Sequence, residues 1–152
     1  MSDLVLLQCV AAYPTPLSDI NVRVVSTLQE EFDVLAGLSD HTLDPVTSPS
    51  AAVALGASMV EKHFTLDNSM EGPDHQFALE PDELEIMVDA VRDIESVLGD
   101  TSKKVLDIEE ELHNLARRRI HATKQIDAGE QLTQDNVGVL RSGNQSTGLH
   151  PR

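Results

Sequence analysis

The chain is poor in cysteine and in aromatic residues. Its single cysteine, Cys9, cannot form an internal disulfide, which fits a reducing cytoplasm. Because Cys9 sits within an apolar run, we expect it to be a small buried residue. There is no tryptophan, one tyrosine and three phenylalanines, so aromatic packing contributes little to any core.

Long hydrophobic runs are also missing. No stretch approaches the roughly 18 apolar residues of a membrane-spanning helix, and the start lacks the basic and then apolar pattern of a signal peptide. The sequence therefore predicts a cytoplasmic protein without a membrane span.

Positive charge is scarce. The 26 acidic and 11 basic residues give a formal net charge of −15. Such a field repels nucleic acids and anionic membranes, which excludes both as expected partners. Few lysines among many acids is typical of halophilic proteins, in which salt screens the repulsion, although many acidic mesophilic proteins share this composition.

Short apolar runs alternate with helical patterns over residues 1–99, which predicts a parallel α/β sheet built of three βα units. Strands are expected at 4–10, 34–38 and 57–60, the first of them buried on both faces. Helices are expected from Asp19 to Phe32, over 48–56 with Ser48 as N-cap, and from about Pro81 to a stop at Gly99. Three strands alone would leave unpaired edges, so the pattern indicates part of a larger α/β barrel.

The sequence changes character after residue 99. Residues 100–116 are charged and predict either a solvated helix or a linker. A strand is expected at 119–123, a turn at 126–130 and a short capped helical turn at 133–137.

Two histidines follow neighbouring predicted strands, in Ser39-Asp40-His41 and in Glu61-Lys62-His63. Parallel strands end at the same edge of a sheet, so both rings should reach one pocket. Imidazole is a common ligand of divalent metals, and nearby carboxylates favour Mn²⁺ or Mg²⁺. The alternative is that each histidine is a hydrogen-bonded structural residue. The absence of a cysteine cluster argues against a zinc or iron–sulfur site.

Several further segments carry a resemblance to one family, the sialic acid synthases. They are Tyr-Pro-Thr-Pro at 13–16, Gly-Leu-Ser-Asp-His-Thr-Leu at 37–43, Glu-Lys-His-Phe-Thr-Leu-Asp at 61–67, Glu-Gly-Pro-Asp-His at 71–75 and Ala-Gly-Glu-Gln-Leu-Thr at 128–133. The resemblance implies the last three βα units of a (β/α)₈ TIM barrel at 1–99, a linker at 100–116, and the truncated start of an antifreeze-like (SAF) domain at 117–152.

The resemblance also implies roles for six residues. His41 and His63 match the metal ligands, Asp74 a catalytic carboxylate near the metal and the sugar, and Ser39 and Tyr13 substrate-binding residues. Arg141 matches a substrate-binding arginine that enters the partner subunit's site in a homodimer. Two departures are Ala11, where relatives often have Asn or Ser, and Arg141-Ser142-Gly143-Asn144-Gln145 in place of Arg-Pro-Gly-Asn-Gly.

The implied reaction joins phosphoenolpyruvate to N-acetylmannosamine or a related N-acyl amino sugar, giving a nonulosonic acid and phosphate with Mn²⁺ or Mg²⁺ as cofactor. The family's first five βα units, which supply most phosphoenolpyruvate contacts, have no counterpart here. Three readings stay open: a synthase component completed by a separate N-terminal half, an inactive remnant, and a non-catalytic sugar-binding or metal-binding regulatory protein.

Overall fold

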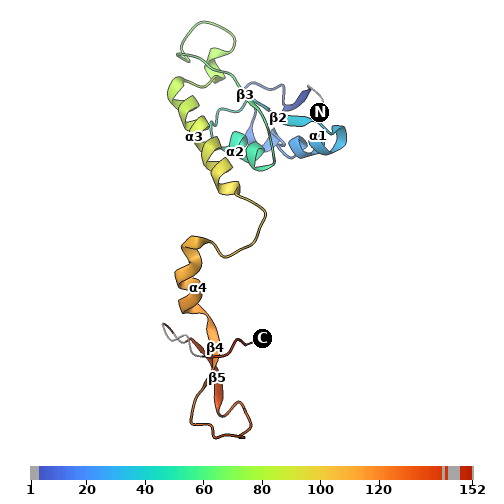
Figure 1. Cartoon of the computed structure of the whole chain (residues 1–152). Helices are drawn as coiled ribbons and strands as arrows, with labels where there is room; N and C mark the ends of the chain where they lie inside the picture. Colours follow the sequence, from blue (N-terminus) through green and yellow to red (C-terminus); the bar gives the residue numbers. More distant parts are fainter. Residues whose placement is uncertain (1–3, 142, 144–147, 152) are drawn as a thin grey trace. The chain divides into compact units, whose positions relative to one another are not determined.

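The computed structural model describes residues 4–141, 143 and 148–151, and the chain divides into two compact units, Met1–Asp100 and Thr101–Arg152 (Figure 1). Among these residues, no helix combines the length and hydropathy that crossing a membrane requires.

The first unit is built on a parallel sheet of three strands in the order β1-β2-β3. These strands are β1 (Val5–Cys9), β2 (Leu35–Asp40) and β3 (Val60–Lys62), and the helices that follow them are α1 (Val24–Phe32), α2 (Thr47–Ala54) and α3 (Pro81–Leu98). The three predicted βα units are therefore present. Strand register places Ser39 between Cys9 and Glu61, so all three strands end at one edge.

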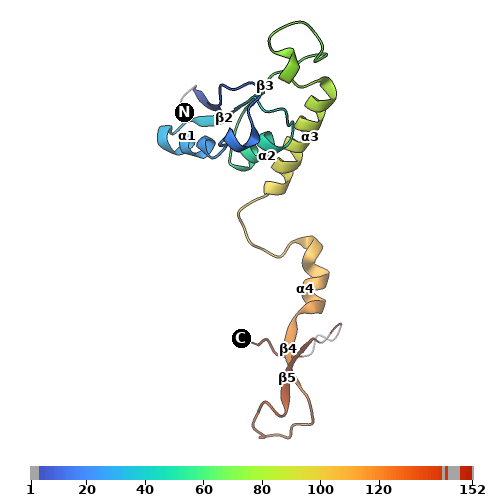
Figure 2. The same cartoon turned by 180° about the vertical axis from the view of Figure 1, so that it is seen from behind.

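The hydrophobic core lies between one face of the sheet and the helices. Ala36 and Leu38 of β2 pack with Val25 of α1, Ala52 of α2 and the nearby Ile20. These contacts place α1 and α2 on the same face of β2, as in a barrel, whereas a doubly wound sheet carries helices on both faces. Helix α3 lies beside α2 in both views (Figures 1 and 2).

The opposite face of the sheet is largely open. Side chains alternate along a strand, so this face carries Leu35, Met59 and Cys9. Leu35 is 50% exposed, Met59 is 47% exposed, and Cys9 is an exposed free thiol. Two predictions were wrong: β1 is not buried on both faces, and Cys9 is not buried. The reason is that α1 and α2 pack on the other face of the sheet.

Two helix starts differ from the predictions. Residues 17–19 form a single 3₁₀ turn, and α1 begins at Val24 because Asn21, with φ of 48°, interrupts the helical path. Ser48 is not the N-cap of α2 but lies inside its first turn. Helix α3 begins at Pro81 and ends before Gly99, which has φ of 56°, as the sequence predicted.

The carboxylate of Asp44 takes over the capping of α2. Its Oδ1 accepts hydrogen bonds from the backbone N–H of Thr47 at 2.6 Å and of Val46 at 2.8 Å. The bond from Thr47 is the main reason why the pKa of Asp44 is lowered from its ordinary value of 3.8. The charged carboxylate therefore stabilises the start of α2, next to the strand that ends at Asp40.

We expect Asp44→Ala to lower the free energy of unfolding by about 1 kcal/mol, as other lost caps do. A carboxyl whose pKa is lowered by folding stabilises the protein above its unfolded pKa, so the loss should be complete at pH 7. The difference from wild type should shrink as pH falls from about 4 through the lowered pKa. Urea denaturation at several pH values, in high salt to screen the net negative charge, measures this, with Glu30→Ala on α1 as control. A pH-independent difference would refute the capping role.

The second unit is a helix followed by a hairpin. It contains a 3₁₀ turn at Asp107–Glu109, α4 (Glu110–Ala116), β4 (Arg118–Ala122) and β5 (Val137–Arg141), the two strands being antiparallel. The charged segment 100–116 therefore includes a helix. The predicted strand and helical turn are present, the latter closed by Val137 N–H on the Thr133 carbonyl at 3.0 Å. Ser142, Asn144 and Gln145 of the predicted loop departure lie outside the described residues.

Candidate active site

The two predicted histidines meet at the carboxyl ends of β2 and β3. His41 follows β2 directly, His63 follows β3, and their ring centroids are 5.2 Å apart. A cavity of about 190 Å³ lies here, lined by Ser39, Asp40, His41, Glu61, Lys62 and His63. The expected convergence of the rings is therefore present, and it comes from the parallel register of two adjacent strands.

Aromatic rings flank the two imidazoles. The Tyr13 ring centroid lies 4.2 Å from that of His41 and 5.9 Å from that of His63. Phe77 lies 5.2 Å from both Tyr13 and His63. The sequence pointed to Tyr13 but not to Phe77, whose one signal is that it is an aromatic residue in a loop close to Asp74 and His75. Together the two rings place apolar surface beside the imidazole pair.

The tautomer of His41 follows from its hydrogen bond. Its Nδ1 lies 2.7 Å from the carbonyl oxygen of Val10, which can only accept, so Nδ1 carries the proton. The lone pair of the neutral ring is then on Nε2. Metal-binding histidines are commonly held in this way, by a carbonyl that receives the second N–H. A buried imidazole with an oriented lone pair thus faces the site.

The donor set fits a divalent metal with few protein ligands. Within residues 4–141, 143 and 148–151, no group of three or more His, Cys, Asp or Glu side chains is arranged to hold a metal. Two imidazoles would therefore supply nitrogen ligands and leave the other positions to water or substrate oxygens. Open positions of this kind are typical of catalytic rather than structural metal sites.

Asp74 lies close to His63 but is not bonded to it. Its Oδ2 is 3.9 Å from His63 Nδ1, beyond hydrogen-bond distance, and its side chain is 60% exposed. The carboxylate is therefore at the mouth of the site and accessible from solvent. This position suits a group that meets a ligand, while its predicted catalytic role stays a prediction.

Ser39 is paired with a residue that the sequence reasoning missed. Its Oγ donates to Glu61 Oε1 at 2.6 Å, across the pair β2–β3. Glu61 precedes His63 by two residues, so strand alternation places both on one face, and this spacing was the available signal. The acidic side chain of Glu61 adds a hydrogen-bond acceptor to the lining of the cavity.

Arg141 belongs to the second unit. It ends β5, is exposed, and stands opposite Arg118 in the strand register. Two like charges facing each other across a hairpin are unfavourable unless an anion lies near them. Its predicted role in binding substrate in a partner subunit stays a prediction.

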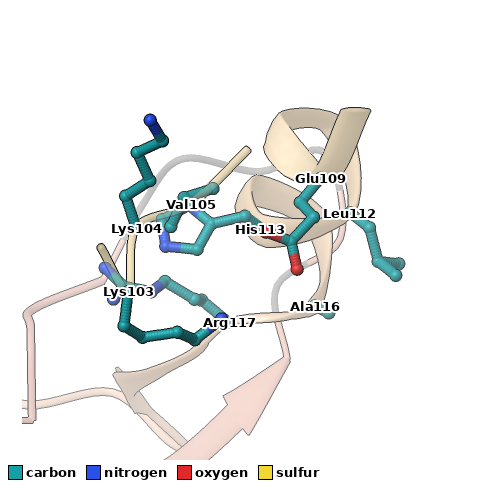
Figure 3. A pocket seen from close by; sticks show the side chains of 8 residues that line it. All are labelled: Lys103, Lys104, Val105, Glu109, Leu112, His113, Ala116 and Arg117. Carbon is teal, nitrogen blue, oxygen red and sulfur yellow. The ribbon is translucent and has the colours of Figure 1, made fainter. Parts of the chain in front are cut away.

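A larger cavity, of about 500 Å³, lies within the second unit between residues 103–105 and α4 (Figure 3). It is lined by Lys103, Lys104, Val105, Glu109, Leu112, His113, Ala116 and Arg117. Most of these side chains are solvent-exposed, and Glu109 bonds the backbone N–H of Leu106 at 2.9 Å. Size alone therefore does not single out the site, since the smaller cavity holds the converging imidazoles.

Comparison with known proteins identifies the family. The pattern of the NeuB family matches residues 1–103, which include all of β1 to α3. The chain belongs to the NeuB family. The resemblance to sialic acid synthases is thereby confirmed.

Individual relatives are similar over nearly the whole chain. The spore coat polysaccharide biosynthesis protein SpsE of Bacillus subtilis is 41% identical over 165 residues, covering 99% of this chain and 44% of SpsE. The pseudaminic acid synthase of Campylobacter jejuni is 44% identical over 152 residues, covering 99% of this chain and 42% of that enzyme.

A solved structure is similar to this chain as well. The crystal structure of N-acetylneuraminic acid (sialic acid) synthetase from Leptospira borgpetersenii in complex with citrate matches with a TM-score of 0.64 and 34% identity, covering 72% of this chain and 38% of that chain. This chain therefore spans less than half the length of each of these three relatives.

Proposed function

We propose that this chain forms the metal-binding end of a synthase site that joins phosphoenolpyruvate to an N-acyl amino sugar. The site requires the remaining βα units of a (β/α)₈ barrel, so the 152 residues are inactive alone. The observation that carries the proposal is the pair of imidazoles, His41 and His63, 5.2 Å apart at the carboxyl edge of a parallel sheet. This edge is where α/β barrels hold their chemistry.

In the proposed reaction, the terminal carbon of the phosphoenolpyruvate double bond forms a bond to the aldehyde carbon of the open sugar. Water adds to the neighbouring carbon, and phosphate leaves with the oxygen that joined it to that carbon. Mn²⁺ or Mg²⁺ held by His41 and His63 would supply Lewis acidity toward the aldehyde oxygen. No redox step occurs, in keeping with a site built from imidazole, hydroxyl and carboxylate groups.

The other site residues are proposed to bind and orient the substrates. Tyr13 and Phe77 offer apolar surface to a sugar ring or its acyl group. Asp74, at the mouth, accepts hydrogen bonds from sugar hydroxyls or from a metal-bound water. Ser39, held by Glu61, lies beside phosphoenolpyruvate, and Arg141 is proposed to contact the sugar's acyl end from a second subunit of a homodimer.

The proposed amino sugar is N-acetylmannosamine or a relative, such as a diamino-dideoxy sugar. The names of the relatives differ in their products, pseudaminic acid in one and N-acetylneuraminic acid in another. In this chain Ala11 offers no polar side chain near Tyr13, so a polar substituent there would lose a partner. The choice among sugars therefore depends mainly on residues of the remaining barrel.

The test is to join this chain to the N-terminal portion of SpsE that it does not match, and to assay phosphate release from phosphoenolpyruvate with each amino sugar and Mn²⁺. We expect the joined protein to release phosphate and form a nonulosonic acid detectable by mass spectrometry. The chain alone should not exceed a no-enzyme control. A joined protein that folds and binds amino sugar without releasing phosphate would favour the alternative of a non-catalytic sugar-binding protein.

A further inference from the structure

A buried ion pair is formed by the two residues that immediately precede the histidines in the sequence. Asp40 and Lys62 are the last residues of β2 and β3, and they are partners in the strand register. Lys62 Nζ lies 2.7 Å from Asp40 Oδ2, and the two side chains are 3% and 0% exposed. The sequence motifs around His41 and His63 contain this pair, yet no step of the proposed reaction uses it.

Every charged atom of the pair has partners. Asp40 Oδ2 accepts from Ser48 Oγ at 2.7 Å and from Thr42 Oγ1 at 3.1 Å, and Oδ1 accepts from the Thr42 backbone N–H at 2.9 Å. Lys62 Nζ also donates to the carbonyl of Thr42 and, at 3.4 Å, to that of Asp44. A buried ion pair is tolerated when its hydrogen bonds are complete in this way.

The bonds of Lys62 cross from one histidine's strand to the other histidine's loop. Lys62 precedes His63, while Thr42 and Asp44 follow His41. Strand β3 has only three residues and pairs with β2 over three positions, and the His63 carbonyl accepts from the Leu79 backbone N–H at 2.8 Å. The hydrogen bonds of Lys62 add a direct link between β3 and the loop after His41.

We propose that Asp40 and Lys62 are a positioning pair, which sets the spacing of His41 and His63 so that both rings bind one metal ion. This inference rests on the proposed function. A site with two protein ligands depends on their placement more than a site with four, since small errors in ligand position weaken a metal site. Both residues line the same cavity, and their proposed effect is on the placement of the two rings.

The test uses Cu²⁺ as a probe in the joined synthase, because imidazole sites bind it strongly and its electron paramagnetic resonance counts nitrogen ligands. The variants are Lys62→Met, Asp40→Leu and the double substitution, with Lys124→Met as the matched lysine control. Unfolding in urea is measured in parallel. Each single variant leaves one buried charge unpaired and should be destabilised.

The double variant distinguishes a positioning role of the pair from a purely structural one. It leaves no unpaired charge, so most of the stability should return, but the bridge between β3 and the loop after His41 is still missing. We expect its Cu²⁺ affinity to stay about 10-fold to 100-fold below wild type, the usual effect of lost outer-shell partners, with one imidazole bound in place of two.

Recovery of wild-type affinity and of two bound imidazoles in the double variant would overturn the proposal and leave the pair a structural one. A different result tests the proposed function itself. If wild type shows no two-imidazole signal, or if His63→Ala leaves that signal unchanged, then the metal site fails before the positioning pair is in question.

Discussion

Replacing His63 with alanine in the joined synthase should lower phosphate release by about a thousand-fold or more. Lewis-acid stabilisation of developing charge is worth several kcal/mol, and each 1.36 kcal/mol corresponds to a factor of ten in rate. His41→Ala should have the same effect, because the two rings are proposed to share one ion. Phosphate release measured over a Mn²⁺ titration checks both variants.

The control for these variants is His113→Ala, which removes an imidazole from α4 in the second unit. It should keep the wild-type rate and the wild-type response to Mn²⁺. If His63→Ala retained the same Mn²⁺ dependence as wild type, the metal would act elsewhere and His63 would be a structural residue.

The second large effect concerns the chain by itself. Strands β1 and β3 are the two edges of the sheet, and the face opposite α1 and α2 carries the half-exposed Leu35 and Met59. Burying apolar surface is worth about 25 cal/mol per Å², so a few hundred Å² left exposed costs several kcal/mol. A domain's whole stability is only about 5–15 kcal/mol. We therefore expect a partly unfolded or self-associated species in dilute buffer.

Salt and complementation should restore order. The net charge of −15 repels copies of the chain and opposes compaction, and salt screens that repulsion. Sedimentation velocity and thermal melts at low and high salt, with and without the remaining barrel portion, measure these effects. A sharp cooperative melt of a monomer at low salt would mean that the open face is closed by the chain itself, against the interpretation as part of a barrel.

The sequence predicted those features that depend on local patterns. Apolar runs and helical periodicity gave three βα units, and Pro81 and Gly99 gave the ends of α3. Two histidines after adjacent strands gave the imidazole pair, because parallel strands leave their ends side by side. These predictions needed no knowledge of the rest of the molecule.

Features that depend on distant partners were not predicted. Cys9 lies in an apolar run, but which face of β1 is covered depends on helices far along the chain. Ser48 has the right chemistry for an N-cap, yet Asp44 caps the helix and Ser48 bonds Asp40 instead. The partners of Lys62 and Glu61 follow from register between strands, which the local sequence does not specify.

The most direct test of the metal site is a crystal of the joined synthase, or of this chain in an ordered state, grown with Mn²⁺ and measured at the manganese absorption edge. We predict one anomalous peak bonded to ring nitrogens of both His41 and His63, with Nδ1 of His41 still on the Val10 carbonyl. An anomalous peak elsewhere, or none between the two rings at saturating Mn²⁺, would contradict the account.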